Sequence, residues 1–581
     1  MHMPLTAAQA KAKARSNVWP AVLVFLVALV VRFAAGGTLP LLSDEAWHLL
    51  AGHSWIHEGT LRVDQGAYTR AGYYTILVAW FMDAFGETLA VARLPGVIAG
   101  AALVLAVFEW LRRQSGLIAG WIGALLVCFH DLSILLSAEV RFYTLHALCL
   151  WLTAAIVYQV AEGDSGRRQS VWMLAVAAAL SAVALLVQAT AGVALAAIVL
   201  WAVCDLAYRF RTCLWAAVRS HWILAAVSAV VLLGGAVSIF LHPPAALAGL
   251  YAEFRHTAYW AQPRQDWMLF YERYYSETIT LLWGLFPPAF AAAFIHRPRA
   301  AVYCAFLFIV PTLIMSFGGM KAGRYVFFAL PYLFATWGLA ADAVSAKAVQ
   351  SGYQAWDQIC NLIVGSRHNQ AAEEGRWRRY GFAIAAVVVL AFAVFSQVSY
   401  RESAKLIVKS ARTALSQPAQ ILTGPPFEPW AGHRNELMRM IERASIFITA
   451  KPTTTLLALR PADVVLTRNL LDDEFTPSES SDESEFVIDR RVGRPVVGTT
   501  GSLQAIMDCY QTGIVIVPDA YWRNRAAVTE EVANLLMVTA KLTRMTAPNA
   551  PEELLVFEWE SAPPSSTAAC GELGRKLSLN P

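Results

Sequence analysis

Two adjacent carboxylates, Asp44 and Glu45, stand in the stretch LPLLSDEAWHLL, directly after the first long apolar run of the chain. A carboxylate beside a reacting hydroxyl can take its proton as a general base. The ordinary alternative is a pair of solvated charges at a helix end, where most carboxylates are exposed. Their place after an apolar run favours chemistry at a membrane boundary, with Asp44 as the first choice for the base and Glu45 as the second.

Three other short stretches combine charged and aromatic side chains: SAEVRFYTLH, GGMKAGRYVFFALP and YTRAGYY. Their candidate residues are Glu139, Arg141, Tyr143, Lys321, Arg324, Tyr325, Arg70 and Tyr73. An arginine fork can bind two phosphate oxygens, while lysine acts as a point charge. Basic residues at a membrane edge are also common interfacial anchors. We expect a site here because carboxylates and cations recur on the same side of one membrane.

The composition requires a membrane protein. The chain has 581 residues, of which 57% are hydrophobic and 15% charged, whereas soluble domains usually carry about 25% charged residues. Its net charge of +4 is small, and no basic block is interleaved with aromatics. Nucleic-acid binding is therefore not expected.

Apolar runs long enough to span a bilayer recur along the first 398 residues. We place them at about 19–39, 91–111, 116–136, 142–161, 170–187, 189–208, 221–241, 278–295, 300–317, 324–342 and 380–398. The fold class predicted is a polytopic α-helical membrane protein with about 11 to 13 transmembrane helices. The first run follows KAKARSNVWP and has no small-residue cleavage site, so we interpret it as a retained helix and not a signal peptide.

The segment from Tyr73 to Gly86 is apolar but short, which favours a helix lying along the interface. If it does not cross and the N-terminus is cytoplasmic, the arginine-rich short loops all face inward, as the positive-inside rule requires. The four candidate stretches then share the outer face. A longer outer loop, residues 242–276, is rich in aromatics and arginine, as a sugar-binding lid or an interfacial aromatic belt would be.

Residues 399–581 have a different pattern, in which short β-branched runs alternate with helical stretches. The expected strands are QILTGPP, DVVLTRN, RPVVGTT and TGIVIVPD, and the expected helices include GHRNELMRMIERA and SLQAIMDCY. Such alternation predicts a small α/β domain with a parallel sheet. The acidic stretch DDEFTPSESSDESEF is expected to be a loop. We therefore divide the chain into a transmembrane domain, 1–398, and an extracytoplasmic α/β domain, 399–581.

The order of these motifs resembles that of the GT-C glycosyltransferases, over roughly the first 345 residues. The shared features are a DEA pair after the first helix, an E-x-R-x-Y loop, and K-x-x-R-Y before a proline-bearing helix. The resemblance is to the branch of protein O-mannosyltransferases and bacterial aminoarabinose transferases acting on lipid A. Many relatives follow their basic residue with paired prolines, whereas Arg70 is followed by AGYY, and this departure weakens the donor-binding roles of Arg70, Tyr73 and Tyr74.

The resemblance implies an inverting transferase that moves a sugar from a polyprenyl-phosphate carrier to an acceptor on the extracytoplasmic side. The acceptor would be lipid A, an envelope glycan or a protein hydroxyl. Because phosphate leaves without a protonated partner, one base suffices, unlike in glycoside hydrolases. Lys321 and Arg324 would hold the carrier phosphate, and Glu139 would orient the acceptor or a cation. The enzyme would lie among the lipids of the bacterial inner membrane with its active site facing the periplasm.

Histidines add an unassigned feature. His53 and His57 would share one face of a helix that also carries His48. The sequence identifies no certain cofactor, although some members of the wider GT-C class use a divalent cation. A surface or interfacial role is the alternative for these histidines. His130 and Asp131 fall inside the expected third span, where ionisable residues are functional candidates or pair with each other.

Two alternative functions remain open, and so does the question whether two cysteines form a disulfide. A flippase or transporter of lipid-linked sugars would also need cations for a phosphate, although the inverted repeats of many transporters are not evident. A glycan polymerase would use the long outer loop. The tail has two cysteines, Cys509 and Cys570, which form a disulfide or two thiols in an oxidising compartment.

Overall fold

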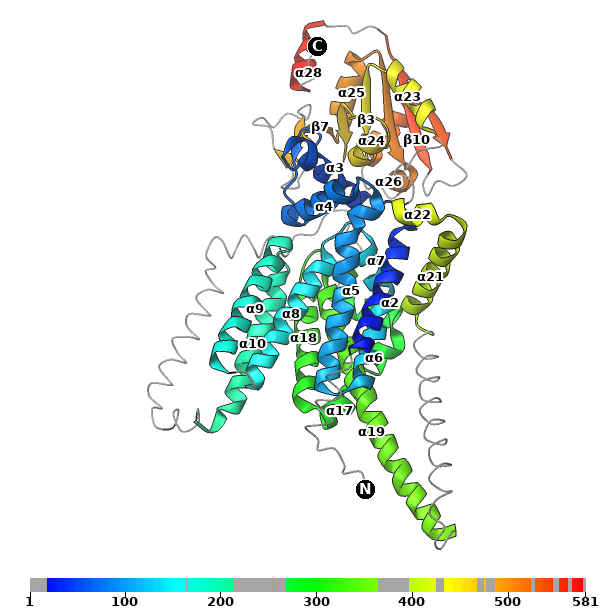
Figure 1. Cartoon of the computed structure of the whole chain (residues 1–581). Helices are drawn as coiled ribbons and strands as arrows, with labels where there is room; N and C mark the ends of the chain where they lie inside the picture. The colour runs from blue at the N-terminus through cyan, green and yellow to red at the C-terminus, as the bar shows by residue number, and fades with distance from the viewer. Residues whose placement is uncertain are drawn as a thin grey trace. The chain divides into compact units, whose positions relative to one another are not determined.

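The computed structural model describes residues 18–163, 166–213, 219, 254, 268–363, 396–424, 433–467, 475–476, 486–523, 528–546, 553–562 and 567–577. The chain divides into two compact units (Figure 1). The helical unit comprises Met1–Gly36, Pro95–Thr257 and Arg264–Pro418, and the α/β unit comprises Gly37–Leu94, Ala258–Pro263 and Ala419–Pro581. The division expected at 398/399 therefore differs from the structural one, which groups residues 37–94 with the tail.

The helical unit is a bundle of long apolar helices. Its elements are α2 (Trp19–Gly36), α5 (Leu89–Gln114, which begins in the α/β unit), α6 (Leu117–Cys128), α7 (Asp131–Ala138), α8 (Tyr143–Glu162), α9 (Arg167–Val187), α10 (Ala191–Arg209), α15 (Phe270–Thr278), α16 (Thr280–Gly284), α17 (Phe286–His296), α18 (Pro298–Ser316), η2 (Gly323–Tyr325), η3 (Phe327–Ala329), α19 (Leu330–Ile363) and α21 (Val398–Ser416). Helix α19 packs against α6, α17 and α18, and α8 packs against α9 and α10.

Seven helices in the described part of the chain are long and apolar enough to span a membrane, and an eighth span results if α6 and α7 count as one. The membrane fold class is thus confirmed. The expected spans at 221–241 and at 380–398, except for its last few residues, lie outside the described residues, as does most of the loop 242–276. Helix α4 (Gly72–Phe85) has 14 residues, which agrees with the expected short segment, and its interfacial position remains a prediction.

The third expected span is not continuous. Helix α6 ends at Cys128, α7 begins at Asp131, and their axes differ by 61°. A break inside a membrane helix leaves backbone carbonyls that need new donors. The Arg32 guanidinium in α2 donates to the Cys128 carbonyl oxygen over 3.4 Å and to the Ser133 hydroxyl over 2.8 Å. These hydrogen bonds provide partners at the break.

An eight-stranded mixed sheet forms the centre of the α/β unit, in the order β5-β6-β7-β4-β3-β8-β10-β9. Its strands are β3 (Ile446–Thr449), β4 (Val464–Leu466), β5 (Phe475–Thr476), β6 (Val487–Asp489), β7 (Arg494–Val497), β8 (Thr512–Pro518), β9 (Lys541–Met545) and β10 (Leu554–Glu560). The four central strands β7, β4, β3 and β8 are parallel, and the outer strands pair antiparallel. The predicted parallel α/β core is present.

Side chains alternate between the two faces of a sheet along each strand. Apolar side chains of the central strands point to both faces, and helices cover each face. On one face Val515 and Val517 belong to a buried cluster with residues of α25, α27 and α28. On the other, Ile514 and Ile516 pack with residues of α23. These helices and the short ones are α22 (Pro418–Thr423), α23 (Arg434–Arg443), α24 (Pro452–Ala458), α25 (Thr500–Cys509), α26 (Asp519–Arg523), α27 (Glu530–Thr539) and α28 (Thr567–Lys576).

The segment after the first helix is an integral part of the α/β unit. It contains α3 (Ser43–Glu58), a two-stranded hairpin of β1 (Arg62–Val63) and β2 (Gly66–Ala67), and α4. Ala51, Val63 and Tyr68 pack with Val465 and Val496 of the sheet. This apolar contact covers the part of the sheet formed by β4 and β7, which explains why the structural division departs from chain order.

Polar contacts fix the same hairpin. The Arg494 guanidinium donates two hydrogen bonds to the Asp64 carboxylate, at 2.5 and 3.0 Å. Asp64 has a left-handed backbone with φ of 55°, which aspartate tolerates better than most residues. Gly66 lies so close to Arg491 that an added Cβ would stand 2.2 Å from its carbonyl carbon. A side chain at position 66 would therefore force the hairpin off the sheet.

Two details of the tail prediction are wrong. QILTGPP was expected to be a strand, but its first four residues belong to helix α22. Pro418 is favourable at the first helical position, and Gly424 with φ of 82° ends the turn; these signals outweigh the β-branched side chains. The central strand β3, IFIT, was missed. The acidic stretch lies largely outside the described residues.

Cys509 and Cys570 form a disulfide with a Cα–Cα distance of 5.2 Å. The bond joins the end of α25 to α28, so the first of the two sequence alternatives holds. It closes a loop of 61 residues. Disulfides typically contribute about 2 to 4 kcal/mol of stabilisation.

Candidate active site

The two adjacent carboxylates of α3 have different environments. Both lie in the first turn, where a negative charge interacts favourably with the positive end of the helix dipole. Glu45 is fully buried, and its carboxylate accepts hydrogen bonds from Arg93 Nε at 2.9 Å and Arg93 Nη2 at 2.7 Å. Asp44 is partly exposed. Of the pair, Asp44 is therefore the more accessible carboxylate.

Arg93 is the functional neighbour that sequence reasoning missed. Besides Glu45, its guanidinium donates to the carbonyl oxygens of Leu39 at 2.8 Å and Pro40 at 3.0 Å. Glu45 also accepts from the Leu42 backbone N–H at 3.0 Å. The pair thus fixes the segment leading into α3, and with it the position of Asp44. A lone arginine within the expected span 91–111 was the signal that could have identified it.

Arg70 and Tyr73 lie in the same unit, at the start of α4. Both are exposed, Tyr73 with 63% of its surface accessible. The chain reaches α4 through Ala71, which has a left-handed φ of 45°. The structure leaves both side chains accessible to a ligand.

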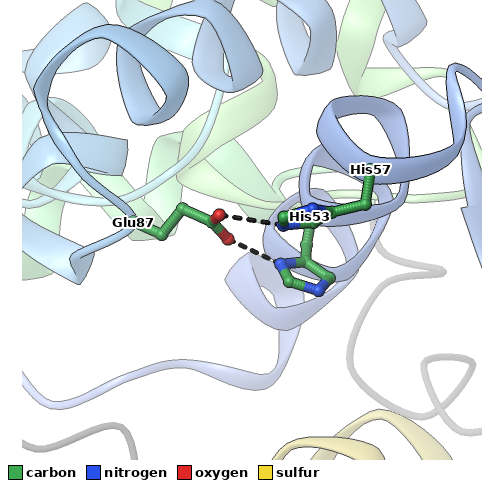
Figure 2. A group of neighbouring side chains, drawn as sticks. All are labelled: His53, His57 and Glu87. Atoms are coloured by element: carbon green, nitrogen blue, oxygen red, sulfur yellow. Dashed lines mark hydrogen bonds and ion pairs between the residues drawn. The ribbon is translucent and has the colours of Figure 1, made fainter.

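His48 is separated from the other two histidines of α3. It is buried, with its Nδ1 at 2.9 Å from the Thr75 hydroxyl and its ring edge-on to Tyr68 and Tyr74. This cage joins α3 to α4. His53 and His57 instead both hydrogen bond to Glu87 on the exposed side of α3 (Figure 2).

Glu87 is held by the two imidazoles. Partial burial raises the pKa of the Glu87 carboxyl, and hydrogen bonds from His53 and His57 lower that pKa by more. The net direction is downward, so the carboxylate form is favoured. Two imidazole nitrogens and one carboxylate are donors that could hold a divalent cation.

The helical unit brings together the other two candidate stretches. Arg141 donates to the Tyr143 hydroxyl at 3.1 Å, and its guanidinium lies 5.3 Å from the centroid of that ring. The Tyr143 ring is 6.5 Å from that of Tyr325, over which the Arg324 guanidinium lies at 5.3 Å. The E-x-R-x-Y loop and the K-x-x-R-Y turn are therefore neighbours.

Lys321 and Glu139 complete this group. Lys321 is buried with 3% of its surface accessible, although lysine is almost always exposed. Glu139 is half-buried and directly follows α7, which packs against η2. The helical unit thus gathers two arginines at two tyrosine rings, and a buried lysine and a half-buried carboxylate lie close to them in the chain. Such a group can bind an anionic oxygen ligand.

His130 and Asp131 lie at the break between α6 and α7. His130 Nδ1 is 3.3 Å from the Asp131 carboxylate, so the pairing considered from the sequence is present. The His130 ring is also packed against Phe334 and Tyr400. These contacts indicate a structural role at the bend.

The fold is that of the GT-C glycosyltransferases. ArnT from Cupriavidus metallidurans, in the apo state, matches with 16% identity and a TM-score of 0.52, over 92% of this chain and 97% of that one. ArnT bound to undecaprenyl phosphate matches at 15% identity and 0.51, over 93% and 98%. The Archaeoglobus fulgidus oligosaccharyltransferase in the apo form matches at 10% and 0.55, over 95% and 76%. No protein-family model and no curated protein sequence matches.

Proposed function

We propose that this chain is an inverting glycosyltransferase that moves a sugar from a polyprenyl-phosphate carrier to a hydroxyl of an extracytoplasmic acceptor. The observation that carries the proposal is that Arg141 and Arg324 lie at the neighbouring rings of Tyr143 and Tyr325, with the buried Lys321 three residues before Arg324. Cations at the outer end of apolar helices suit a phosphate whose tail lies in lipid. A GT-C fold similar to an enzyme bound to undecaprenyl phosphate supports the same ligand class.

Asp44 is proposed as the general base. In the reaction the anomeric carbon loses its bond to the carrier phosphate oxygen, which leaves with the bonding electrons, and gains a bond to the acceptor oxygen. The acceptor proton passes to Asp44. Asp44 suits this role because it is partly exposed at the start of a helix, whereas Glu45 is occupied by Arg93. We therefore propose that Glu45 acts as a positioning residue.

The remaining candidates are proposed to bind substrate. Lys321 and Arg324 hold the carrier phosphate, Arg141, Tyr143 and Tyr325 line its site, and Glu139 orients the acceptor. Arg70 and Tyr73 are proposed to contact the sugar or the acceptor. The protein would lie in the bacterial inner membrane, with this face and the α/β unit in the periplasm, and the acceptor would be lipid A, an envelope glycan or a protein.

The test is binding of undecaprenyl phosphate to the purified full-length protein in lipid nanodiscs. Lys321→Ala and Arg324→Ala should each weaken binding at least about tenfold, the scale of one lost charge-assisted hydrogen bond of about 1.5 kcal/mol or more. Lys405→Ala removes an exposed lysine paired with Glu402 and should leave binding unchanged. Equal affinity of all four proteins would contradict the proposed phosphate site.

Transfer itself is tested with a labelled polyprenyl-phosphate sugar and an envelope extract as acceptor. Label in the glycan or protein fraction without any nucleotide sugar supports the transferase. Movement of intact donor across the vesicle membrane without cleavage of its glycosyl bond would instead support a flippase.

A further inference from the structure

The exposed side of α3 holds a cluster that the proposed transfer reaction does not use. His53 and His57 lie one helical turn apart, and Glu87 comes from the connection between α4 and α5. His53 Nδ1 is 2.6 Å from Glu87 Oε2, and His57 Nε2 is 3.0 Å from Glu87 Oε1. Both rings turn toward the one carboxylate (Figure 2). We propose that these three side chains bind one divalent transition-metal ion of the zinc type.

Local backbone structure presents the three donors to one another. Residues at i and i+4 share a helix face, and the ring centroids of His53 and His57 are 4.3 Å apart. Gly86 ends α4 with its N–H bonded to the Met82 carbonyl and a φ of 101°. That φ is strained for any residue with a Cβ. Glycine therefore allows the sharp turn that brings Glu87 to α3.

The donor set selects the class of metal. Two imidazole nitrogens and one carboxylate oxygen are a ligand set of zinc sites in which water takes the fourth position. Mg²⁺ and Ca²⁺ prefer oxygen ligands, and soft-metal sites use thiolates, which this cluster lacks. All three side chains are exposed, so an ion and its water can enter directly from solvent.

The geometry needs little change to hold an ion. The three ligand atoms lie within 4.8 Å of one another. Tetrahedral bonds of about 2.0 to 2.1 Å place neighbouring ligand atoms roughly 3.3 Å apart. The present nitrogen–oxygen distances of 2.6 and 3.0 Å therefore open by roughly half an ångström, which rotation of exposed side chains provides.

The bound ion would act on the helix that carries Asp44. Helix α3 is already joined at its first turn to α5 through Glu45 and Arg93. The ion would join a later turn of α3 to Glu87, which lies two residues before the start of α5. Two attachments along α3 resist its rotation better than one, so the bound ion would stabilise the α/β unit. This effect does not depend on the proposed transfer reaction.

The experiment measures the binding of Zn²⁺ to the full-length protein in detergent. Bound metal is first removed with a chelator, and Zn²⁺ is then the only metal added. The wild-type protein should retain about one equivalent of Zn²⁺ after gel filtration and melt at a higher temperature with it. His53→Ala and Glu87→Gln should each weaken Zn²⁺ binding by at least about 10- to 100-fold, since loss of an outer-shell partner alone costs this much. Binding should also weaken as pH falls, because imidazole binds metal only when neutral.

The matched control is His296→Ala. His296 Nε2 also contacts a carboxylate, Asp342, at 3.2 Å, but it does not belong to the three-residue cluster. This variant should keep the full Zn²⁺ equivalent. Equal Zn²⁺ retention by wild type, His53→Ala and Glu87→Gln would overturn the proposal, because binding elsewhere would then explain all the metal.

A spectroscopic readout keeps the proposal testable if a variant fails to fold. Co²⁺ in place of Zn²⁺ should give the wild-type protein the intense visible absorption of a four-coordinate site. Absence of this absorption in folded wild-type protein with Co²⁺ in excess would overturn the site, whatever the transferase assay shows. A hydrogen-bonded His–Glu–His triad without metal would then be the correct description.

Discussion

Arg93 and Arg32 are both fully buried, but the regions around them stabilise the guanidinium in different ways. Arg93, at the start of α5, forms a two-point ion pair with Glu45. Arg32, in α2, is held by the hydroxyls of Ser133 and Ser137 and by carbonyl oxygens. The Arg93–Glu45 pair therefore has no net charge, whereas Arg32 keeps its positive charge among neutral partners.

The difference shows two ways to bury a guanidinium. An ion pair in a low-dielectric site is stable only while both partners remain, since removal of one leaves an uncompensated charge. Arg32 instead lies at the C-terminal end of α6, where the helix dipole and the Cys128 carbonyl favour a cation. Removal of Arg32 leaves only neutral groups. The two arginines should thus respond very differently to substitution.

The largest effect is expected at the ion pair. Glu45→Leu or Arg93→Met should each destabilise the protein by about 3 to 5 kcal/mol, because each leaves the remaining charge buried without its opposite charge. Glu45→Leu combined with Arg93→Met should recover much of this loss. Thermal melting of the four proteins in the same detergent measures the coupling. Losses that simply add in the double variant would show that the pair does not act as a unit.

The next effect separates Asp44 from its neighbour. Asp44→Asn keeps the shape but removes the proton acceptor, so sugar transfer should fall by about 100-fold or more while the melting temperature stays close to that of the wild type. Glu45→Gln should instead lower the melting temperature clearly, because it removes the charge partner of the buried Arg93. Near-full transfer by a well-folded Asp44→Asn variant would exclude Asp44 as the base.

Replacement of Arg32 should cost less than replacement of Arg93. Arg32→Met removes the hydrogen bonds of the guanidinium, but it leaves no opposite charge buried without a partner. Ser137 can still donate to the Ser133 carbonyl, as it does already at 2.5 Å. Melting of Arg32→Met beside Arg93→Met makes the comparison. An Arg32 loss equal to or above that of Arg93 would refute the proposed difference.

The smallest effect concerns the hairpin on the sheet. Arg494→Ala should destabilise the α/β unit by about 1 to 2 kcal/mol, since its pair with Asp64 is mostly but not fully buried. Limited proteolysis should then cut the segment around residue 64 faster. Arg523→Ala, which removes a far more exposed arginine paired with Asp519, is the control. Equal cleavage of both variants would mean that the Asp64 pair does not hold the hairpin.

The sequence alone determined the features that depend on local composition. Runs of apolar residues identified the membrane helices, since a bilayer imposes a minimum length. Alternation of β-branched runs with amphipathic stretches identified the α/β tail. The order of the motifs around Asp44, Arg141 and Lys321 indicated the GT-C class, and the fold agrees with it.

Only the tertiary structure decided how neighbouring residues divide their roles. Asp44 and Glu45 are adjacent carboxylates in the sequence, and what distinguishes their environments in the fold is Arg93, 48 positions after Glu45. Residues 37–94 join the α/β unit because Ala51 and Val63 pack on sheet strands that lie about 400 residues later in the chain. A packing partner so far away produces no recognisable pattern in the local sequence. The broken third span likewise depends on Arg32 from another helix. Composition and spacing specify which elements form, whereas long-range packing and charge pairing decide which face is buried and which carboxylate remains accessible.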